Sequence, residues 1–286
     1  MNRLLLAVLL LLGSLTPALA QRFVAQTATL VAGQAVALDL KFARTIRVRP
    51  GTGLSVQAKV SINGNQQNDA YSLVLDKTGD ELRVEEKLDD NLLRQSNFTG
   101  DCDGGSFNSG SDGVNVNRPG NRRFSGGTGS HEYNYCARID YEVTLPAGAA
   151  LRIKTITGDL DLSELQGAVS ANTVSGNILL SALTGPVMVR SVSGNVQLNR
   201  PGPGPVQAAS VSGNVEASWP ARQAAELTLH TVSGEVYADP AVTFNNLRPN
   251  RSNNVGYELH GSYGTGSGPL VKLESVSGDV FFRKQK

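Results

Sequence analysis

The sequence has little of what most enzymes use for catalysis. Its 286 residues include two cysteines, three histidines and one tryptophan. The histidines, His131, His230 and His260, are scattered and form no His-x-x-x-His pair, so no zinc-binding pattern is present. A Gly-x-Ser-x-Gly nucleophile motif is also absent, and the glycine-rich stretch 264–268 lacks the lysine of a phosphate-binding loop. The sequence therefore predicts no catalytic residues, no cofactor and no metal.

Long apolar runs are scarce as well, apart from one at the N-terminus. Arg3 precedes the apolar run 4–12, and Ala18-Leu19-Ala20 has the small-residue pattern of a cleavage site. This predicts a secretory signal peptide over residues 1–20, cleaved after Ala20, and the run is too short to span a bilayer. An uncleaved membrane anchor is the alternative. We therefore expect a periplasmic or extracellular protein with no transmembrane segment in its mature chain.

Excess charge of either sign is missing. Residues 1–20 contain one Arg and no acid, so the predicted mature chain has 25 basic and 25 acidic residues. A nucleic-acid-binding protein would need a basic face, and adhesion to anionic lipids would need a basic cluster. The balance argues against both.

The two cysteines, Cys102 and Cys136, predict one disulfide, because pairing is the usual state of two cysteines in an exported protein. The bond would close a loop of about 35 residues and contribute roughly 4 kcal/mol in the chain-entropy model, less any strain. Free thiols and metal ligation are the alternatives, and only His131 lies nearby.

What the sequence does contain is a repeat. Related eight-residue segments such as TVSGNILL (173) and SVSGNVQL (191) also begin at residues 155, 210, 231 and 275. A fixed period, β-branched alternation and turn residues together predict a parallel β-helix-like β-solenoid with coils of about 18–22 residues. The last step is twice as long as the others, which predicts one hidden, degenerate coil. A left-handed hexapeptide helix is the alternative, but no six-residue pattern is sustained.

Each repeat has a column of turn residues at its centre. We expect the glycines to adopt a positive φ at a coil corner, and the apolar residues of the repeat, including its first valine, to build the core. Flanking Ser/Thr and Asn/Asp/Glu should hold the corner and form ladders between coils. The glycines are Gly158, Gly176, Gly194, Gly213, Gly234 and Gly278.

The first half of the chain lacks this period. Alternating segments such as 36–42 and 54–62 predict an N-terminal antiparallel β layer, within residues 21–136, that caps the solenoid of residues 137–286. Residues 97–135 are rich in Gly, Ser and Asn and predict a long loop bracketed by the cysteines. A second insertion is expected near 239–269.

The repeat units, the preceding Val-x-Leu-Pro-Ala-Gly (143–148) and the closing segment 266–280 resemble the bacterial putative-adhesin β-strand-repeat family. The resemblance covers roughly residues 40–286. It implies an exported, surface-facing β-solenoid-like domain of unknown function, and it implies no catalytic residues.

Three sets of side chains remain as candidates for chemistry. Asp159 and Asp161 share one strand face, and Glu235 and Asp279 occupy one turn column, which we interpret as solvated turn acids. Asp101, Asp103 and Asp112 partly match a calcium loop, although Gly105 and Ser106 break the pattern. Aromatic residues could stack on a sugar or a protein, or belong to the core; they are Tyr133, Tyr135, Trp219, Tyr237 and Phe282.

These features favour a non-enzymatic, adhesin-like module that binds an unknown protein or glycan of the cell envelope or outside the cell, or serves there as structure. One alternative is an envelope polysaccharide lyase or hydrolase on a β-helix scaffold. Another is a sensor component that reports envelope stress to a membrane partner.

The first test concerns the predicted signal peptide and the predicted disulfide. The protein secreted by a bacterial host should begin at Gln21 and, when denatured without reductant, should show no thiol reactive towards Ellman's reagent. Intact mass and N-terminal sequencing check both points. An N-terminus at Met1, or two reactive thiols, would contradict the signal-peptide or disulfide prediction respectively.

Overall fold

The computed structural model describes residues 21–31, 33–95, 106–110, 113–117, 133–245, 256–265 and 267–285. The predicted signal peptide, residues 1–20, lies outside these ranges. Most described residues lie in β-strands, and the described chain has one short helix, α1 (Asp90–Leu93), and one 3-10 turn, η1 (Asn68–Ala70).

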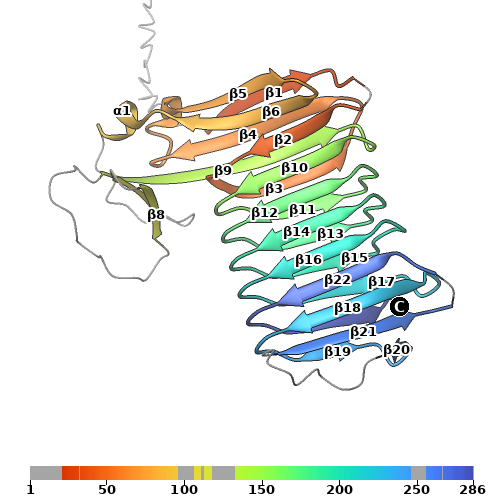
Figure 1. Ribbon diagram of the computed structural model, residues 1–286. Coiled ribbons are helices and arrows are strands. Elements are labelled where there is room, and N and C mark those ends of the chain that lie inside the picture. Colours follow the sequence, from red (N-terminus) through yellow and green to blue (C-terminus); the bar gives the residue numbers. More distant parts are fainter. Residues whose placement is uncertain are drawn as a thin grey trace, which may run out of the picture.

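Two long sheets run along the length of the molecule and face each other across the core (Figure 1). We call the 12-stranded one sheet A; in spatial order it contains β1 (Arg22–Ala28), β4 (Leu54–Ile62), β9 (Tyr133–Leu145), β3 (Ala43–Pro50), β11 (Asp159–Ser163), β13 (Ile178–Ser181), β15 (Val196–Asn199), β17 (Val215–Trp219), β23 (Val280–Lys284) and β19 (Val236–Ala238), with β7 (Ser106–Gly110) and β8 (Gly113–Asn117) attached to β9. We call the 11-stranded one sheet B; it contains β20 (Val242–Phe244), β21 (Tyr257–Tyr263), β18 (Ala225–Thr231), β22 (Leu270–Ser275), β16 (Val206–Ser210), β14 (Val187–Ser191), β12 (Val169–Thr173), β10 (Ala150–Thr155), β2 (Ala35–Asp39), β6 (Glu81–Leu88) and β5 (Tyr71–Thr78).

Each central coil contributes one strand to sheet B and the next to sheet A, and neighbouring coils pair in parallel. Within a strand, alternate side chains point inward, so Val169, Val187 and Val206 form one buried column of the core. The predicted all-β fold with long parallel sheets is therefore confirmed.

The first valine of the repeat does not belong to this core, contrary to our expectation. Val174, Val192, Val211 and Val276 lie at the corners after β12, β14, β16 and β22 and are 44–48% exposed, whereas Ile156 and Val232 at the same position of their repeats are half-buried. The corner interrupts the strand alternation, so these valines point into solvent, whereas Ile178 in the following strand is buried.

The predicted degenerate coil is wrong, and its place is taken by a change of order. The last coil, β22–β23, lies between β16–β17 and β18–β19, and Figure 1 shows the blue strand β22 between β16 and β18. The 44-residue step instead contains the antiparallel pair β20–β21, which extends sheet B beyond β18.

The N-terminal strands also differ from the expected antiparallel layer. β2 and β3 pair in parallel with β10 and β11 on one side and with β6 and β9 on the other. Antiparallel pairs lie at the outer ends of the two sheets, where β4 pairs with β1 and β9, and β5 pairs with β6. The early segments thus build coils of the same kind without the repeat sequence.

The segment 97–135 is not entirely a loop. Residues 106–110 and 113–117 form an antiparallel hairpin, β7–β8, and β7 pairs with the start of β9. The rest of the segment, up to residue 132, lies outside the described residues.

The glycine column is explained by close stacking, and not by positive φ as predicted. None of the six glycines has a positive φ. A Cβ on Gly194 would instead lie 2.1 Å from the carbonyl oxygen of Gly176, and the same contact recurs at Gly176, Gly213, Gly278 and Gly234. The left-handed residues occupy the opposite corner of the coils, at Glu164, Ala182 and Arg200.

Two ladders of side chains run beside the glycines. The first residue of the repeat is buried, and the hydroxyls of Ser191, Ser210, Ser275 and Thr231 each donate to the glycine carbonyl of the preceding coil, at 2.8–3.0 Å. The predicted ladder after the glycine is confirmed, because each backbone N–H donates to the side-chain oxygen of the coil before it; its members are Asp159, Asn177, Asn195, Asn214, Asp279 and Glu235.

A carboxyl group is buried at the N-terminal end of the core. Glu86 is 5% exposed and accepts hydrogen bonds from the backbone N–H of Phe42 and from the hydroxyl of Tyr141. The Tyr141 hydroxyl lies 3.0 Å from that of Tyr71. Burial raises the pKa of Glu86 to about 7, although both hydrogen bonds oppose the rise.

Substitution of a stacking glycine should open the coil spacing. Gly194→Ala places its Cβ against a backbone carbonyl, which cannot move away without breaking ladder bonds, so we expect a loss of about 1–3 kcal/mol in unfolding free energy. Gly148→Ala is the matched control, because a Cβ there meets nothing within 4 Å. Urea unfolding followed by circular dichroism measures both; equal midpoints would contradict the stacking explanation.

Glu86 should make stability pH-dependent. The folded state binds its proton more tightly than the unfolded chain, whose carboxyl has a pKa near 4.5. Stability is therefore full below pH 4.5 and falls by about 3 kcal/mol as the pH rises to about 7. Glu86→Gln should remove this fall, whereas Glu226→Gln, which replaces an exposed residue of β18, should keep it. A wild-type urea midpoint independent of pH between 4.5 and 7 would contradict the prediction.

Candidate ligand-binding groove

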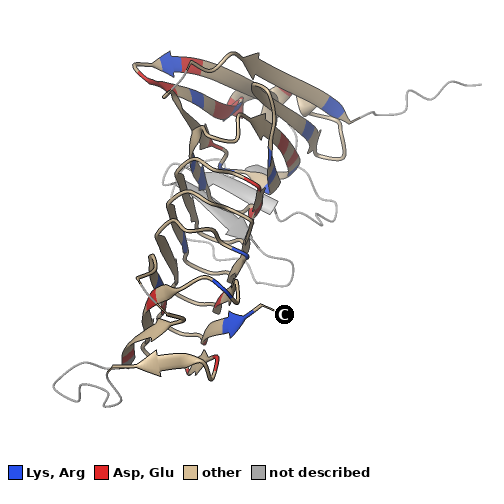
Figure 2. Cartoon of the chain, turned by 90° about the vertical axis from the view of Figure 1, so that its right-hand side faces the viewer, with Lys and Arg blue, Asp and Glu red and all other residues tan. Residues whose placement is uncertain are grey.

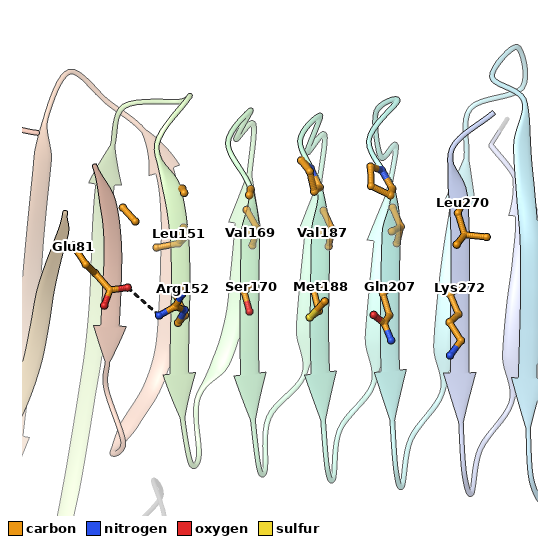
Figure 3. Close-up of a pocket in the computed structure, with 16 residues that line it drawn as sticks. Glu81, Leu151, Arg152, Val169, Ser170, Val187, Met188, Gln207, Leu270 and Lys272 are labelled. Carbon is orange, nitrogen blue, oxygen red and sulfur yellow. Dashed lines mark hydrogen bonds and ion pairs between the residues drawn. The ribbon is translucent and has the colours of Figure 1, made fainter. Parts of the chain in front are cut away.

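A groove of about 440 Å³ runs across the outer face of sheet B, near the starts of its strands. Figure 3 shows its residues arranged strand by strand along the solenoid. Its lining comes from β2, β6, β10, β12, β14, β16, β22 and the turns before them; the residues that project into it or form its rim include Arg152, Ser170, Met188, Gln207, Leu270 and Lys272.

The parallel register creates this row. Arg152 aligns with Ser170, Ser170 with Met188, Met188 with Gln207, and Gln207 with Lys272. Because strands in a sheet lie about 4.8 Å apart, these outward side chains repeat at that interval. Any extended ligand along the groove would contact one residue of each coil in turn.

Small and cyclic residues hollow the surface beside this row. Ala150, Ala168, Pro186 and Pro205 stand at or just before the starts of their strands, where larger side chains would fill the space. Proline is tolerated there because the first position of a strand needs no N–H for the ladder. The proline carbonyl still belongs to the hydrogen-bond ladder of the sheet, since the Val187 N–H donates to the Pro205 carbonyl oxygen at 2.9 Å.

The groove is mostly apolar, and its charged side chains belong to strands at or near its two ends. Met188 and Leu270 are each 51% exposed, which is unusual for large apolar side chains. Arg152 forms a 3.0 Å ion pair with Glu81 at one end, and Lys272 a 2.8 Å ion pair with Glu274 near the other. The floor therefore offers apolar contact, with charge pairs confined to the ends.

Charge is otherwise concentrated elsewhere. Figure 2 shows most basic and acidic residues at the N-terminal end of the solenoid and few on the central coils. Ion pairs there join β3 to its neighbours, such as Arg47 with Glu142 and Arg49 with Asp161. These exposed pairs contribute little to stability, and they leave the central coils as surfaces of low charge.

A second hollow, of about 460 Å³, lies near the N-terminal end of sheet A. Hydroxyl groups and backbone line it, from Thr27, Thr29, Thr52, Ser55 and Thr144. It contains no charged or titratable side chain and so offers no acid–base chemistry.

The acids that the sequence singled out are engaged in structure. Asp159 and Asp161 share the outer face of β11, as predicted. Asp159 accepts a bond from Asn177, and Asp161 forms an ion pair with Arg49 at 2.6 Å. Glu235 and Asp279, expected to be separated by a degenerate coil, are neighbours, and the Asp279 carboxylate accepts the Glu235 N–H at 2.9 Å.

The candidate aromatics divide between core and surface. Trp219, Phe282 and Tyr135 are buried, whereas Tyr237 on β19 is 51% exposed. Only the backbone of Tyr133 is described.

The remaining candidates stay predictions. Cys136 is buried, but Cys102 lies outside the described residues, so their pairing is untested. His131, Asp101, Asp103 and Asp112 lie outside them too. Among the side chains that are described, no three His, Cys, Asp or Glu gather as a possible metal site, and His230 and His260 occupy neighbouring strands of sheet B.

Sequence reasoning did not find the groove. Its signal was a column of small residues or prolines at the start of each sheet B strand, which becomes visible only when the coils are aligned. The exposed Met188 and Leu270 stand in different registers of the repeat and gave no separate signal.

A family model described as Toastrack DUF4097 matches residues 138–283, more than half of the chain. The chain belongs to this family. The Toastrack match covers the coils from β9 to β23, including the out-of-order last coil and all of the groove except Ala35 and Glu81. It agrees with the resemblance drawn from the repeat motif, and the family is a domain of unknown function.

Two solved structures are similar to this Toastrack protein. One is a putative cell adhesion protein from Clostridium sporogenes, 12% identical, with a TM-score of 0.47, covering 93% of this chain and 100% of its own. The other is a putative adhesin from Bacteroides fragilis, 11% identical, with a TM-score of 0.37, covering 92% of this chain and 97% of its own. No curated protein matches the sequence. No helix among the described residues is long and apolar enough to cross a membrane.

Proposed function

We propose that this protein is an exported, non-enzymatic binding module of the cell envelope or the extracellular space. In this proposal the stacked coils are a rigid scaffold, and the groove on sheet B binds an extended segment of a partner protein. The observation that carries the proposal is the groove itself, an apolar hollow continuous over successive coils.

The chemistry of the groove favours a polypeptide. Met188, Leu270 and the alanines and prolines beside them can bury apolar side chains. The charged ends are internally paired, by Arg152 with Glu81 and by Lys272 with Glu274, so they favour no strongly charged ligand. An extended chain presents the side chains of one face about 6.7 Å apart, so they would follow the groove without matching each coil, whose spacing is about 4.8 Å.

Export is supported by the N-terminal sequence, and the names of the two similar structures are compatible with a surface role. The lyase or hydrolase alternative requires free acids converging on one cleft. The groove instead contains one acid, Glu81, which is paired with Arg152. Nothing in the groove favours the sensor alternative over direct binding.

A groove-blocked variant tests the proposal. Met188→Glu with Leu270→Glu places two carboxylates in the apolar floor without touching the core, because both side chains point outward. Labelled mature protein is applied to an array of 12-residue peptides and to a glycan array that includes peptidoglycan fragments. We expect apolar peptides to bind the wild type and to lose at least tenfold in affinity with the variant, about 1.4 kcal/mol.

Ser72→Glu with Gln57→Glu is the matched control, since it adds the same charge at exposed positions away from the groove. It should bind like the wild type. No ligand on either array, or equal binding by the groove-blocked variant, would overturn the proposal. A glycan lost by the groove-blocked variant would keep the binding role and overturn the choice of a polypeptide.

A further inference from the structure

The C-terminal end of sheet A carries an exposed aromatic stack on the face opposite the groove. Tyr237 on β19 aligns with Phe281 on β23, and their rings are stacked, with centroids 5.0 Å apart and planes 8° from parallel. β19 is the last strand of sheet A in the described chain. Tyr237, which is 51% exposed, is therefore the last residue in its register along sheet A.

Arg283, on the same strand as Phe281, also contacts the Phe281 ring. The guanidinium of Arg283 lies 4.7 Å from the Phe281 ring centroid and within 3.5 Å of the Glu216 carboxylate. Phe281 thus stands among Tyr237, Arg283 and Glu216, which restricts its rotation. The Tyr237 ring is held by that contact, so a ligand that stacks on it loses little side-chain entropy.

Polar groups extend from this stack along the same outer face. Glu216 aligns with Gln197 on β15, and Ser218 with Asn199. Gln197 and Asn199 are joined by a hydrogen bond of 3.3 Å. The face therefore presents a flat ring, a guanidinium–carboxylate pair and two amides, at successive intervals of about 4.8 Å.

We propose that this surface, which we call the Tyr237 platform, is a glycan-binding site that stacks a neutral pyranose ring on Tyr237 and reads the hydroxyls of the next sugars with Arg283, Glu216 and Gln197. A pyranose has an apolar C–H face suited to an aromatic ring, and hydroxyls around its edge that need both donors and acceptors. Arg283 supplies donors, Glu216 supplies acceptors and Gln197 supplies both.

The charges on the platform select the class of sugar. Arg283 is balanced by Glu216, so the site has no net charge to offer an anionic ligand. An uncharged, hydroxyl-rich chain fits this balance better than a uronate polymer or an acidic peptide. The platform lies on sheet A, away from Met188 and Leu270 on sheet B, so it is independent of the groove.

Titration calorimetry with defined oligosaccharides tests the platform. The probes are β-1,4-linked hexamers of N-acetylglucosamine and of glucose, an α-1,4-linked glucose hexamer and, as an anionic comparison, a galacturonate hexamer. We expect at least one neutral hexamer to bind the mature protein with a millimolar or tighter dissociation constant, and more tightly than the anionic one.

Substitutions of Tyr237 test whether its aromatic ring carries the binding of the oligosaccharide. Tyr237→Ala should weaken the neutral hexamer about tenfold or more, while Tyr237→Phe should keep most of the affinity, because the ring carries the stacking. Phe23→Ala is the matched control, since Phe23 is an exposed aromatic of β1 at the opposite end of the molecule. The groove-blocked variant should bind the hexamer like the wild type, which separates this site from the proposed peptide groove.

Several results would overturn the proposal. These are binding of no neutral hexamer, tighter binding of the galacturonate, and equal loss in Tyr237→Ala and Phe23→Ala. Sedimentation velocity adds another check: if the wild type is a dimer that Tyr237→Ala converts to a monomer, the platform is an interface between copies. Unfolding midpoints of all variants show whether a loss of binding comes from a loss of fold; if Tyr237→Ala fails to fold, Arg283→Ala replaces it, with the same expected loss.

Discussion

The rest of the structure depends on the direct contact between successive coils at the glycine corner. A glycine of one coil lies against the carbonyl of the glycine before it, so closely that no Cβ fits at Gly176, Gly194 or Gly234. Only at this distance can the buried hydroxyl of Ser191 or Ser210 reach the same carbonyl. The contact therefore sets the coil spacing at the corner and satisfies a backbone acceptor that would otherwise be buried without a partner.

This corner chemistry is shared by the four repeats that begin at Ser191, Ser210, Thr231 and Ser275, so it cannot decide which of their coils are neighbours. Side-chain volume in the core decides instead. Phe282 lies between Ala217 and Ala238 in sheet A and packs against Trp219 and Tyr263, with ring centroids 6.0 and 5.5 Å apart. If β19 stacked directly on β17, the two alanines would be neighbours and the space of the phenyl ring would be empty, a costly cavity.

Features that arise from local periodicity were predictable from the sequence. Strand alternation, parallel stacking and the Asn/Asp ladder all repeat along the chain, so the repeat itself reveals them. Prediction failed where a property depends on which segments become neighbours. The place of β22–β23 was hidden because its repeat resembles the others, and the reason for the glycines was missed because a carbonyl from another coil imposes it. The first valine of the repeat was wrongly assigned to the core. Val174 lies in the corner after β12, so it does not follow the alternation of inward and outward side chains within a strand.

Inward and outward side chains are under different constraints, which explains why the repeat motif reveals no binding surface. Inward positions such as Val169 and Val187 must keep their shape to stack, while the outward positions beside them, Ser170 and Met188, differ from coil to coil. The ladder bonds hold the backbone whichever side chains point outward, so the outer face can change without loss of the scaffold. Recognition chemistry is therefore expected in rows across the coils, where no single repeat reveals it, and both the groove and the Tyr237 platform are rows of this kind.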